Sequence, residues 1–311
     1  MDKIDIERLK PIRIGRKGLM GISAGITPLF GANLVSLKAG GTELIFWDPA
    51  ALLAGKSHTG AFNMFPTPCR LDKCSYVFDK RRIRQRKHGQ DVFIHGLVRD
   101  ETFAFCAEPD RVTSWIDIAP GHPVYSGFPF KCRFQVSHLV DEDGLTISFE
   151  LVNRDTRAIP FGYGVHPFWR ILGARKDVAL RVPCPYLLDM ANLVPTGGYS
   201  SVGDLDLRTL RSLDGFNCDN VFWPRKLKDT AEIVMAKPGL KVQIAASSNF
   251  QHMIVYAPPG KRFVCVENLT SAPNAPNLVS AGHSKVAGML LAKPGRTVKG
   301  WIRYTVTRAD R

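Results

Sequence analysis

The segment Leu145-Thr146-Ile147-Ser148-Phe149-Glu150-Leu151 decides the fold class, because apolar and polar side chains alternate along it without a break. Period-two alternation is typical of an antiparallel strand with one buried face. The same pattern recurs in 241–244 and 302–307. Further strands rich in β-branched and aromatic residues are predicted at 33–37, 43–47, 92–98, 113–118, 133–140 and 262–266. The sequence therefore predicts a mostly antiparallel β-sandwich.

The chain contains 27 glycines and 21 prolines, and these turn-forming residues recur between the predicted strands, as hairpins require. Helical signals are few. Asp48-Pro49 predicts a short helix through Leu53, and Asp204 predicts another across Leu207, Leu210 and Leu213. No repeat and no linker-like stretch separates two cores, so we expect one domain over residues 1–311.

Composition narrows the class of protein. Of 311 residues, 45% are hydrophobic and 23% are charged, which is typical of a globular protein and excludes a disordered chain. No apolar run is long enough to span a bilayer and the first five residues carry no signal-peptide pattern, so we expect a cytoplasmic protein without membrane contact. Seven scattered cysteines fit a reducing compartment, and their spacing favours small buried side chains over disulfides or zinc.

A basic run, Lys80 to Lys87, places six positive charges in eight positions of a chain whose net charge is +14. It contains no aromatic residue that could stack on bases, so we expect no nucleic-acid partner. Two interpretations stay open at this stage: a solvated basic hairpin tip, and a loop that helps to hold a phosphate or sulfate.

Local motifs for nucleotide binding, zinc proteases and hydrolase elbows are absent from the sequence, which leaves acid–base chemistry. His166 lies between glycines and aromatic residues in an extended segment, where a satisfied core histidine and a functional one are equally compatible with the pattern. Glu267 ends the apolar stretch 263–266, either at a solvated strand end or in a functional pocket. The pattern around His95, which precedes Gly96, favours a half-exposed position in a strand. The guanidinium of Arg70 can donate hydrogen bonds to hydroxyl groups or anions.

The ordered set of segments 29–37, 67–71, 95–100, 164–168, 266–270 and 291–295 resembles the aldose 1-epimerase (galactose mutarotase) family over nearly the whole chain. The resemblance implies a galactose mutarotase-like β-supersandwich with few short helices. It implies no cofactor and no metal, a monosaccharide as the small-molecule partner, and a monomer or homodimer.

The resemblance also implies roles for single positions. His166 matches the family's general acid and Glu267 its base, while His95 and Arg70 match residues that bind the sugar. For the substrate-binding aspartate we choose Asp219 over Asp214. The chain departs from the family pattern at Cys69, where Asn or Gly is usual, at Phe168-Trp169, and at Asn268, where proline is common.

The implied reaction is mutarotation, the interconversion of α and β anomers of a hexose through ring opening and closure. Glu267 would remove the anomeric proton, and His166, its pKa raised by a nearby negative charge, would protonate the ring oxygen. Two alternatives remain. One is a hexose-6-phosphate 1-epimerase that uses the basic 80–87 loop, and the other is a carbohydrate-binding protein that has lost catalysis on the same fold.

Overall fold

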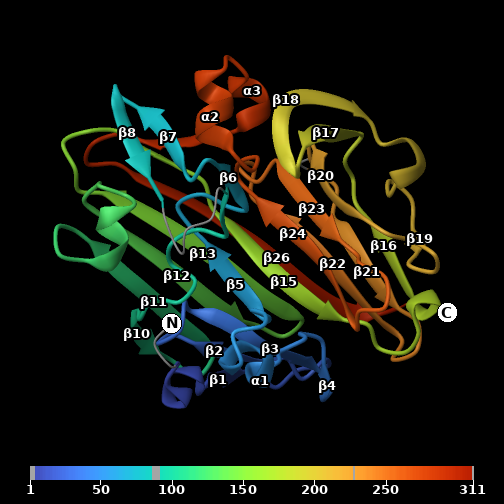
Figure 1. Ribbon diagram of the computed structural model, residues 1–311. Helices are drawn as coiled ribbons and strands as arrows, with labels where there is room; N and C mark the ends of the chain where they lie inside the picture. Colours follow the sequence, from blue (N-terminus) through green and yellow to red (C-terminus); the bar gives the residue numbers. More distant parts are fainter. Residues whose placement is uncertain (1–3, 86–91, 227, 310–311) are drawn as a thin grey trace.

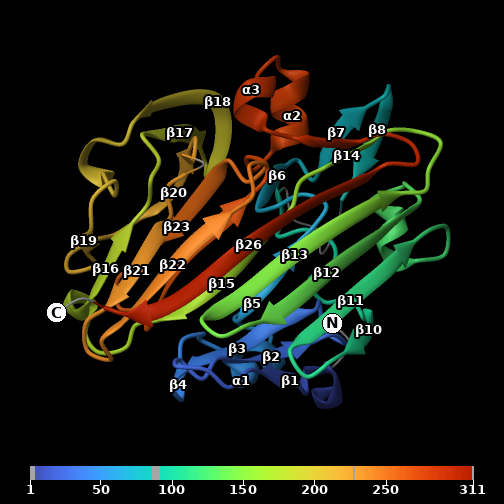
Figure 2. The ribbon, with the colours of Figure 1, turned by 180° about the vertical axis from the view of Figure 1, so that it is seen from behind.

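The computed structural model of the chain describes residues 4–85, 92–226 and 228–309. Two large antiparallel sheets pack face to face in this part of the chain, and Figures 1 and 2 view the pair from opposite sides. The 11-stranded sheet, called sheet A here, consists of β1 (Ile12–Gly15), β2 (Ser23–Thr27), β3 (Asn33–Ala39), β4 (Thr42–Glu43), β5 (Ala61–Met64), β15 (Gly164–Arg170), β24 (Phe263–Leu269), β23 (His252–Tyr256), β20 (Asp219–Trp223), β17 (Tyr186–Ala191) and β18 (Val194–Ser201).

The nine-stranded sheet B faces the viewer in Figure 2. Its strands are β10 (Ala104–Ala107), β11 (Arg111–Ile118), β12 (Cys132–Val140), β13 (Gly144–Asn153), β26 (Thr297–Arg308), β22 (Leu240–Ala246), β21 (Ala231–Met235), β16 (Val178–Arg181) and β19 (Arg211–Ser212). In β13, β22 and the second half of β26 every second residue is buried, which confirms the alternation that predicted these strands.

Three smaller strand pairs complete the described part: β6 (Arg70–Asp72) with β9 (Val92–Ile94), β7 (Ser75–Phe78) with β8 (Arg81–Arg84), and β14 (Ile159–Phe161) with β25 (Leu290–Ala292). The short helices are α1 (Pro49–Leu53), α2 (Ala275–Ser280) and α3 (Ser284–Ala287). Single 3-10 turns occur at Ile6–Leu9, Pro123–Ser126, Arg175–Asp177 and Gly203–Leu205. No helix among the described residues is long and apolar enough to cross a membrane.

The main core lies between the two sheets. The rings of Phe65, just after β5, and Phe134 on β12 stack across it with centroids 4.1 Å apart. The buried Tyr163 hydroxyl donates to Asn63 Oδ1 at 2.7 Å, so the polar atom that this ring brings inward is satisfied. A second apolar cluster covers the opposite face of sheet A, and it includes residues of α2 and α3, which lie next to the edge strand β18. Strands such as β15 and β24 are therefore buried on both faces, which removes the alternation from their sequences.

Some local predictions need correction. The helix from Pro49 to Leu53 is confirmed, with Asp48 Oδ1 accepting a hydrogen bond from the Ala51 N–H at 2.9 Å. The helix predicted after Asp204 is wrong: a 3-10 turn is followed by strand β19. The strand predicted over 43–47 reduces to β4 and an isolated bridge at Ile45.

The basic run needs a correction as well. Its described part begins at the tip of the hairpin between β7 and β8, where Lys80 lies in the turn, and then extends along the whole of β8. The Arg81, Arg82 and Arg84 side chains are exposed and Ile83 is buried, so the solvated hairpin interpretation holds for the tip but the charges lie mainly on a strand. Arg86 and Lys87 lie outside the described residues. The cysteines carry no disulfide, and six of the seven are buried, as predicted, while Cys106 is exposed.

Candidate functional site

A cavity of about 560 Å³ opens on the face of sheet A that is turned away from sheet B. Its floor is a row of side chains contributed by the central strands of the sheet. The register sets Phe62 on β5 opposite His166 on β15, and Ile254 on β23 opposite Glu267 on β24. All five residues predicted for the site line this cavity: Arg70, His95, His166, Asp219 and Glu267. Asp214 is exposed and lies outside the lining.

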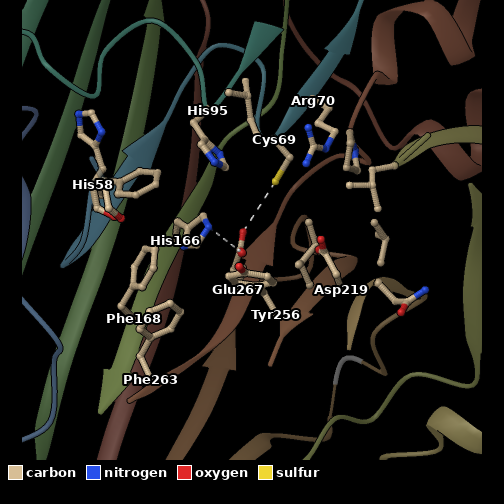
Figure 3. Close-up of a pocket in the computed structure, with 18 of the residues that line it drawn as sticks. His58, Cys69, Arg70, His95, His166, Phe168, Asp219, Tyr256, Phe263 and Glu267 are labelled. Carbon is tan, nitrogen blue, oxygen red and sulfur yellow. Dashed lines mark hydrogen bonds and ion pairs between the residues drawn. The ribbon is translucent and has the colours of Figure 1, made fainter. Parts of the chain in front are cut away.

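The centre of the cavity is the contact between His166 and Glu267. Val165 pairs with Asn268 and Phe168 with Cys265, so His166 falls opposite Glu267 in the same register. The His166 Nε2 and Glu267 Oε1 atoms are 3.2 Å apart (Figure 3). The two residues expose only 6% and 1% of their surfaces. A buried carboxyl thus contacts a buried imidazole in the wall of a cavity that reaches solvent.

Aromatic rings fix the orientation of the imidazole. The ring of His166 stacks on Phe168 at a centroid distance of 4.6 Å and lies 4.8 Å from Phe62. His95 meets it edge to face at 5.1 Å. The Nδ1 atoms of His95 and His166 are buried and have no hydrogen-bond partner among the described residues. Buried polar atoms of this kind call for a partner, which a polar ligand in the cavity can supply.

His95 and Arg70 reach the cavity through the small sheet of β6 and β9, where Arg70 pairs with Ile94. The strand predicted over 92–98 ends early, because His95 and Gly96 have φ values of 69° and 71°. The prediction that His95 is a strand residue is therefore wrong, and the turn at this point directs its ring toward His166. The His95 N–H donates to the Cys69 carbonyl at 2.9 Å, so this turn is tied to the residue before Arg70.

Burial governs the protonation of the central pair. Burial raises the pKa of Glu267 well above its usual value, and the charge of Asp219 adds to the rise. Burial lowers the pKa of His166 to about 3, with a smaller contribution from Arg99. The expected increase in the pKa of His166 is therefore wrong, because desolvation of the buried imidazole is the largest influence and lowers the pKa. Both groups favour their uncharged forms, in which the shared proton resides on Glu267.

Sequence reasoning missed several cavity residues. Lys56, His58, Arg99 and Lys261 also line it, so basic groups surround much of the opening. His58 Nε2 lies 2.8 Å from Asp100 Oδ1, and the Arg99 guanidinium lies 5.7 Å from the centre of the Phe62 ring. Lys56, His58 and Lys261 come from loops without a periodic pattern, so only the fold reveals them. Asp219 is exposed at the rim, in register with Tyr256.

Comparisons with known proteins support the family and the fold. The model of the aldose 1-epimerase family matches residues 21–305, and the chain belongs to this family. The chain is similar to the galactose mutarotase-like protein of Clostridium acetobutylicum, with a TM-score of 0.79 at 16% identity over 96% of this chain and 99% of that one. It is equally similar to the GalM/aldose epimerase homologue of Caenorhabditis elegans, with a TM-score of 0.79 at 17% identity over 96% and 100%.

In sequence, the uncharacterized protein YihR of Escherichia coli K12 is 23% identical over 265 residues, which cover 79% of this chain and 82% of YihR. The galactose mutarotase-like fold expected from the sequence is thereby confirmed. These similarities establish the family and the fold.

Proposed function

We propose that the protein is an aldose 1-epimerase that interconverts the α and β anomers of a hexose. One observation carries the proposal: an imidazole and a carboxyl, 3.2 Å apart, face each other in the wall of one cavity of about 560 Å³. Ring opening of a hemiacetal needs one group that removes the anomeric proton and another that protonates the ring oxygen. Glu267 is assigned the first role and His166 the second, with both roles reversed on ring closure.

The protonation of the pair is compatible with these roles. The neutral pair, Glu267 protonated and His166 neutral, differs from the working pair, a carboxylate and an imidazolium, only in the position of one proton. The 3.2 Å contact between Oε1 and Nε2 allows that proton to pass directly from the carboxyl to the imidazole. A bound sugar brings hydroxyl groups into the cavity, and their hydrogen bonds stabilise the charged forms that burial disfavours. Each of the two groups then contributes about 10² to 10⁴ in rate.

Arg70, His95 and Asp219 are assigned to substrate binding. All three line the cavity around the central pair, as Figure 3 shows. Arginine offers donors to hydroxyl oxygens, and an exposed carboxylate accepts hydrogen bonds from hydroxyl groups. Burial raises the pKa of Asp219, and the positive charge of Arg70 across the cavity reduces that rise.

NMR of anomer exchange tests the proposal. Freshly dissolved α-glucose and α-galactose are monitored with and without the protein, and with the Glu267→Gln variant as a matched control preparation. We expect the wild-type protein to accelerate exchange well above the spontaneous rate. Sugar binding without acceleration would instead support a carbohydrate-binding protein on the same fold.

A second candidate is a phosphorylated hexose as the substrate. It is favoured by the positive charges of Lys56, Arg99 and Lys261 in the cavity lining. The described residues of the basic run, 80–85, do not line this cavity, so a phosphate would be held by those three side chains instead. In the same assay with glucose 6-phosphate, Arg99→Gln would slow exchange of the phosphorylated sugar alone, while Arg81→Gln on β8 serves as the charge-matched control. A strong preference of the wild type for free glucose would eliminate this candidate.

A further inference from the structure

The two oxygens of the Glu267 carboxyl have different partners. Oε1 lies 3.2 Å from His166 Nε2, whereas Oε2 lies 3.7 Å from the sulfur of Cys69, within hydrogen-bond range for a thiol (Figure 3). Cys69 exposes 5% of its surface and lines the same cavity. The carboxyl is therefore held from two sides, and its oxygens are chemically inequivalent.

The backbone holds the thiol in this place. Cys69 has a φ of 55°, and its carbonyl accepts the His95 N–H at 2.9 Å, so the same turn positions Cys69, Arg70 and His95. The thiol has a second neighbour, the Met64 sulfur at 3.8 Å. A carboxylate oxygen is a much stronger acceptor than a thioether, so the single S–H proton is directed to Glu267.

The charges around the carboxyl agree with a donor at this position. Burial and the charge of Glu267 raise the pKa of Cys69, which keeps the thiol in its S–H form. The S–H bond in turn lowers the pKa of Glu267, while burial and Asp219 raise it. Other titratable or charged groups that face the pair come from the surrounding strands and turns: Arg70, His95, His166, Tyr256, Cys265 and Tyr304.

We propose that Cys69 is a positioning residue for the reaction. Its S–H donates to Oε2, which favours the carboxylate form of Glu267 and leaves Oε1, beside His166, to exchange protons with the substrate. This inference rests on the proposed function, because it assumes that Glu267 is the base.

Two donor-free variants, Cys69→Ala and Cys69→Gly, test the inference. Glycine suits the positive φ of this position and serves if the alanine variant fails to fold. Cys69→Ser retains a donor. Cys265→Ala is the matched control, since Cys265 is also buried and lies two residues from Glu267, yet among the described residues it is the Cys69 sulfur that hydrogen-bonds to the carboxyl.

Two measurements are made on each variant: the pH profile of kcat, and the infrared titration of the protonated Glu267 carboxyl, with Glu267→Gln identifying the band. Without the S–H donor the carboxyl binds its proton more tightly, so the acid limb of kcat and the infrared midpoint both move up by about one pH unit. On the acid limb kcat then falls about tenfold, while KM changes by less than about twofold. Cys69→Ser restores both values, and Cys265→Ala keeps those of the wild type.

An unshifted limb and midpoint in the donor-free variants would overturn the inference, as would an equal shift in Cys265→Ala. The infrared measurement separates this failure from a failure of the proposed function. If the wild type does not accelerate anomer exchange, the carboxyl titration still decides whether Cys69 controls the protonation of Glu267.

Discussion

His166 and Glu267 lie directly opposite each other on two neighbouring antiparallel strands, β15 and β24, and their side chains meet at 3.2 Å. Directly opposite residues on one face of a sheet are held by the ladder of backbone hydrogen bonds on both sides. The spacing of the candidate acid and base is thus a property of the sheet register, and it does not depend on the conformation of a loop.

The first prediction concerns the base. Glu267→Gln is expected to lower the rate of anomer exchange by about 10² to 10⁴, because the amide cannot accept the anomeric proton. Folding is expected to be retained, since Gln has the same shape and can still donate to His166. Polarimetry measures the rate and circular dichroism the fold. A variant with near wild-type exchange would remove Glu267 from its role.

The same substitution has a pH-dependent effect on stability. Burial raises the pKa of Glu267, so the folded state binds the proton more tightly than the unfolded state and loses stability as pH rises above about 4.3. Glu267→Gln removes this loss. We expect the variant to unfold at a higher temperature than the wild type at pH 8 and at a similar temperature at pH 4, as measured by calorimetry.

The second prediction concerns the acid. His166→Asn keeps a polar side chain of similar size between Phe62 and Phe168 but cannot carry the transferred proton. We expect exchange to fall by about 10² to 10⁴ with the fold retained. Comparison of KM for the same sugar separates a loss of chemistry from a loss of binding. Exchange at the wild-type rate would show that another group protonates the ring oxygen.

The third prediction concerns Gly96, which follows His95 at a φ of 71°. A Cβ at this position would lie 2.5 Å from the Phe65 carbonyl oxygen, so Gly96→Ala must displace backbone and with it the His95 ring. Gly40→Ala is the control, because Gly40 has a φ of 55° with open space around it and therefore pays only the conformational cost of about 1–2 kcal/mol. Denaturant unfolding is expected to show a larger loss for Gly96→Ala, together with reduced exchange. Equal losses in the two variants would contradict the clash.

The fourth prediction concerns His138 on β12. This side chain is fully buried, and neither ring nitrogen has a hydrogen-bond partner among the described residues. Burial lowers its pKa to about 3, so the unfolded state binds the proton more tightly, and stability is lost as pH falls from about 6.5 toward 3. His138→Leu is expected to remove several kcal/mol of this acid sensitivity. The thermal unfolding midpoints of the wild type and of His138→Leu, measured between pH 4 and pH 8, test this prediction. If the two midpoints change with pH in the same way, His138 is not the source of the acid sensitivity.

The sequence predicted the strands of sheet B well because one face of that sheet is solvated, so β13 and β22 retain the period-two pattern. It overextended the strand at 92–98, because a residue such as His95 gives no sign that it will adopt a positive φ. It did not predict α2 and α3, whose six and four residues are too few to show a helical period.

The five candidate site residues follow from the family resemblance. The sequence pattern alone is equally compatible with a core position for His166 and with a solvated strand end for Glu267. Their meeting in one cavity depends on the pairing of β15 with β24, which no local pattern specifies. The sequence also does not show that Lys56 and Lys261 line the cavity. An isolated lysine in a loop belongs to no periodic pattern that would relate it to a distant strand.

The division of the cavity between strands and loops has a practical consequence for redesign. His166 and Glu267 are borne by the centre of sheet A, whereas Lys56, His58 and Lys261 are borne by connecting segments outside it. Under the proposed function, substitutions in those segments change the part of the cavity that meets the sugar and leave the proposed acid and base in place. A library restricted to these three positions would vary the loop side of the cavity without altering the strands that hold His166 and Glu267.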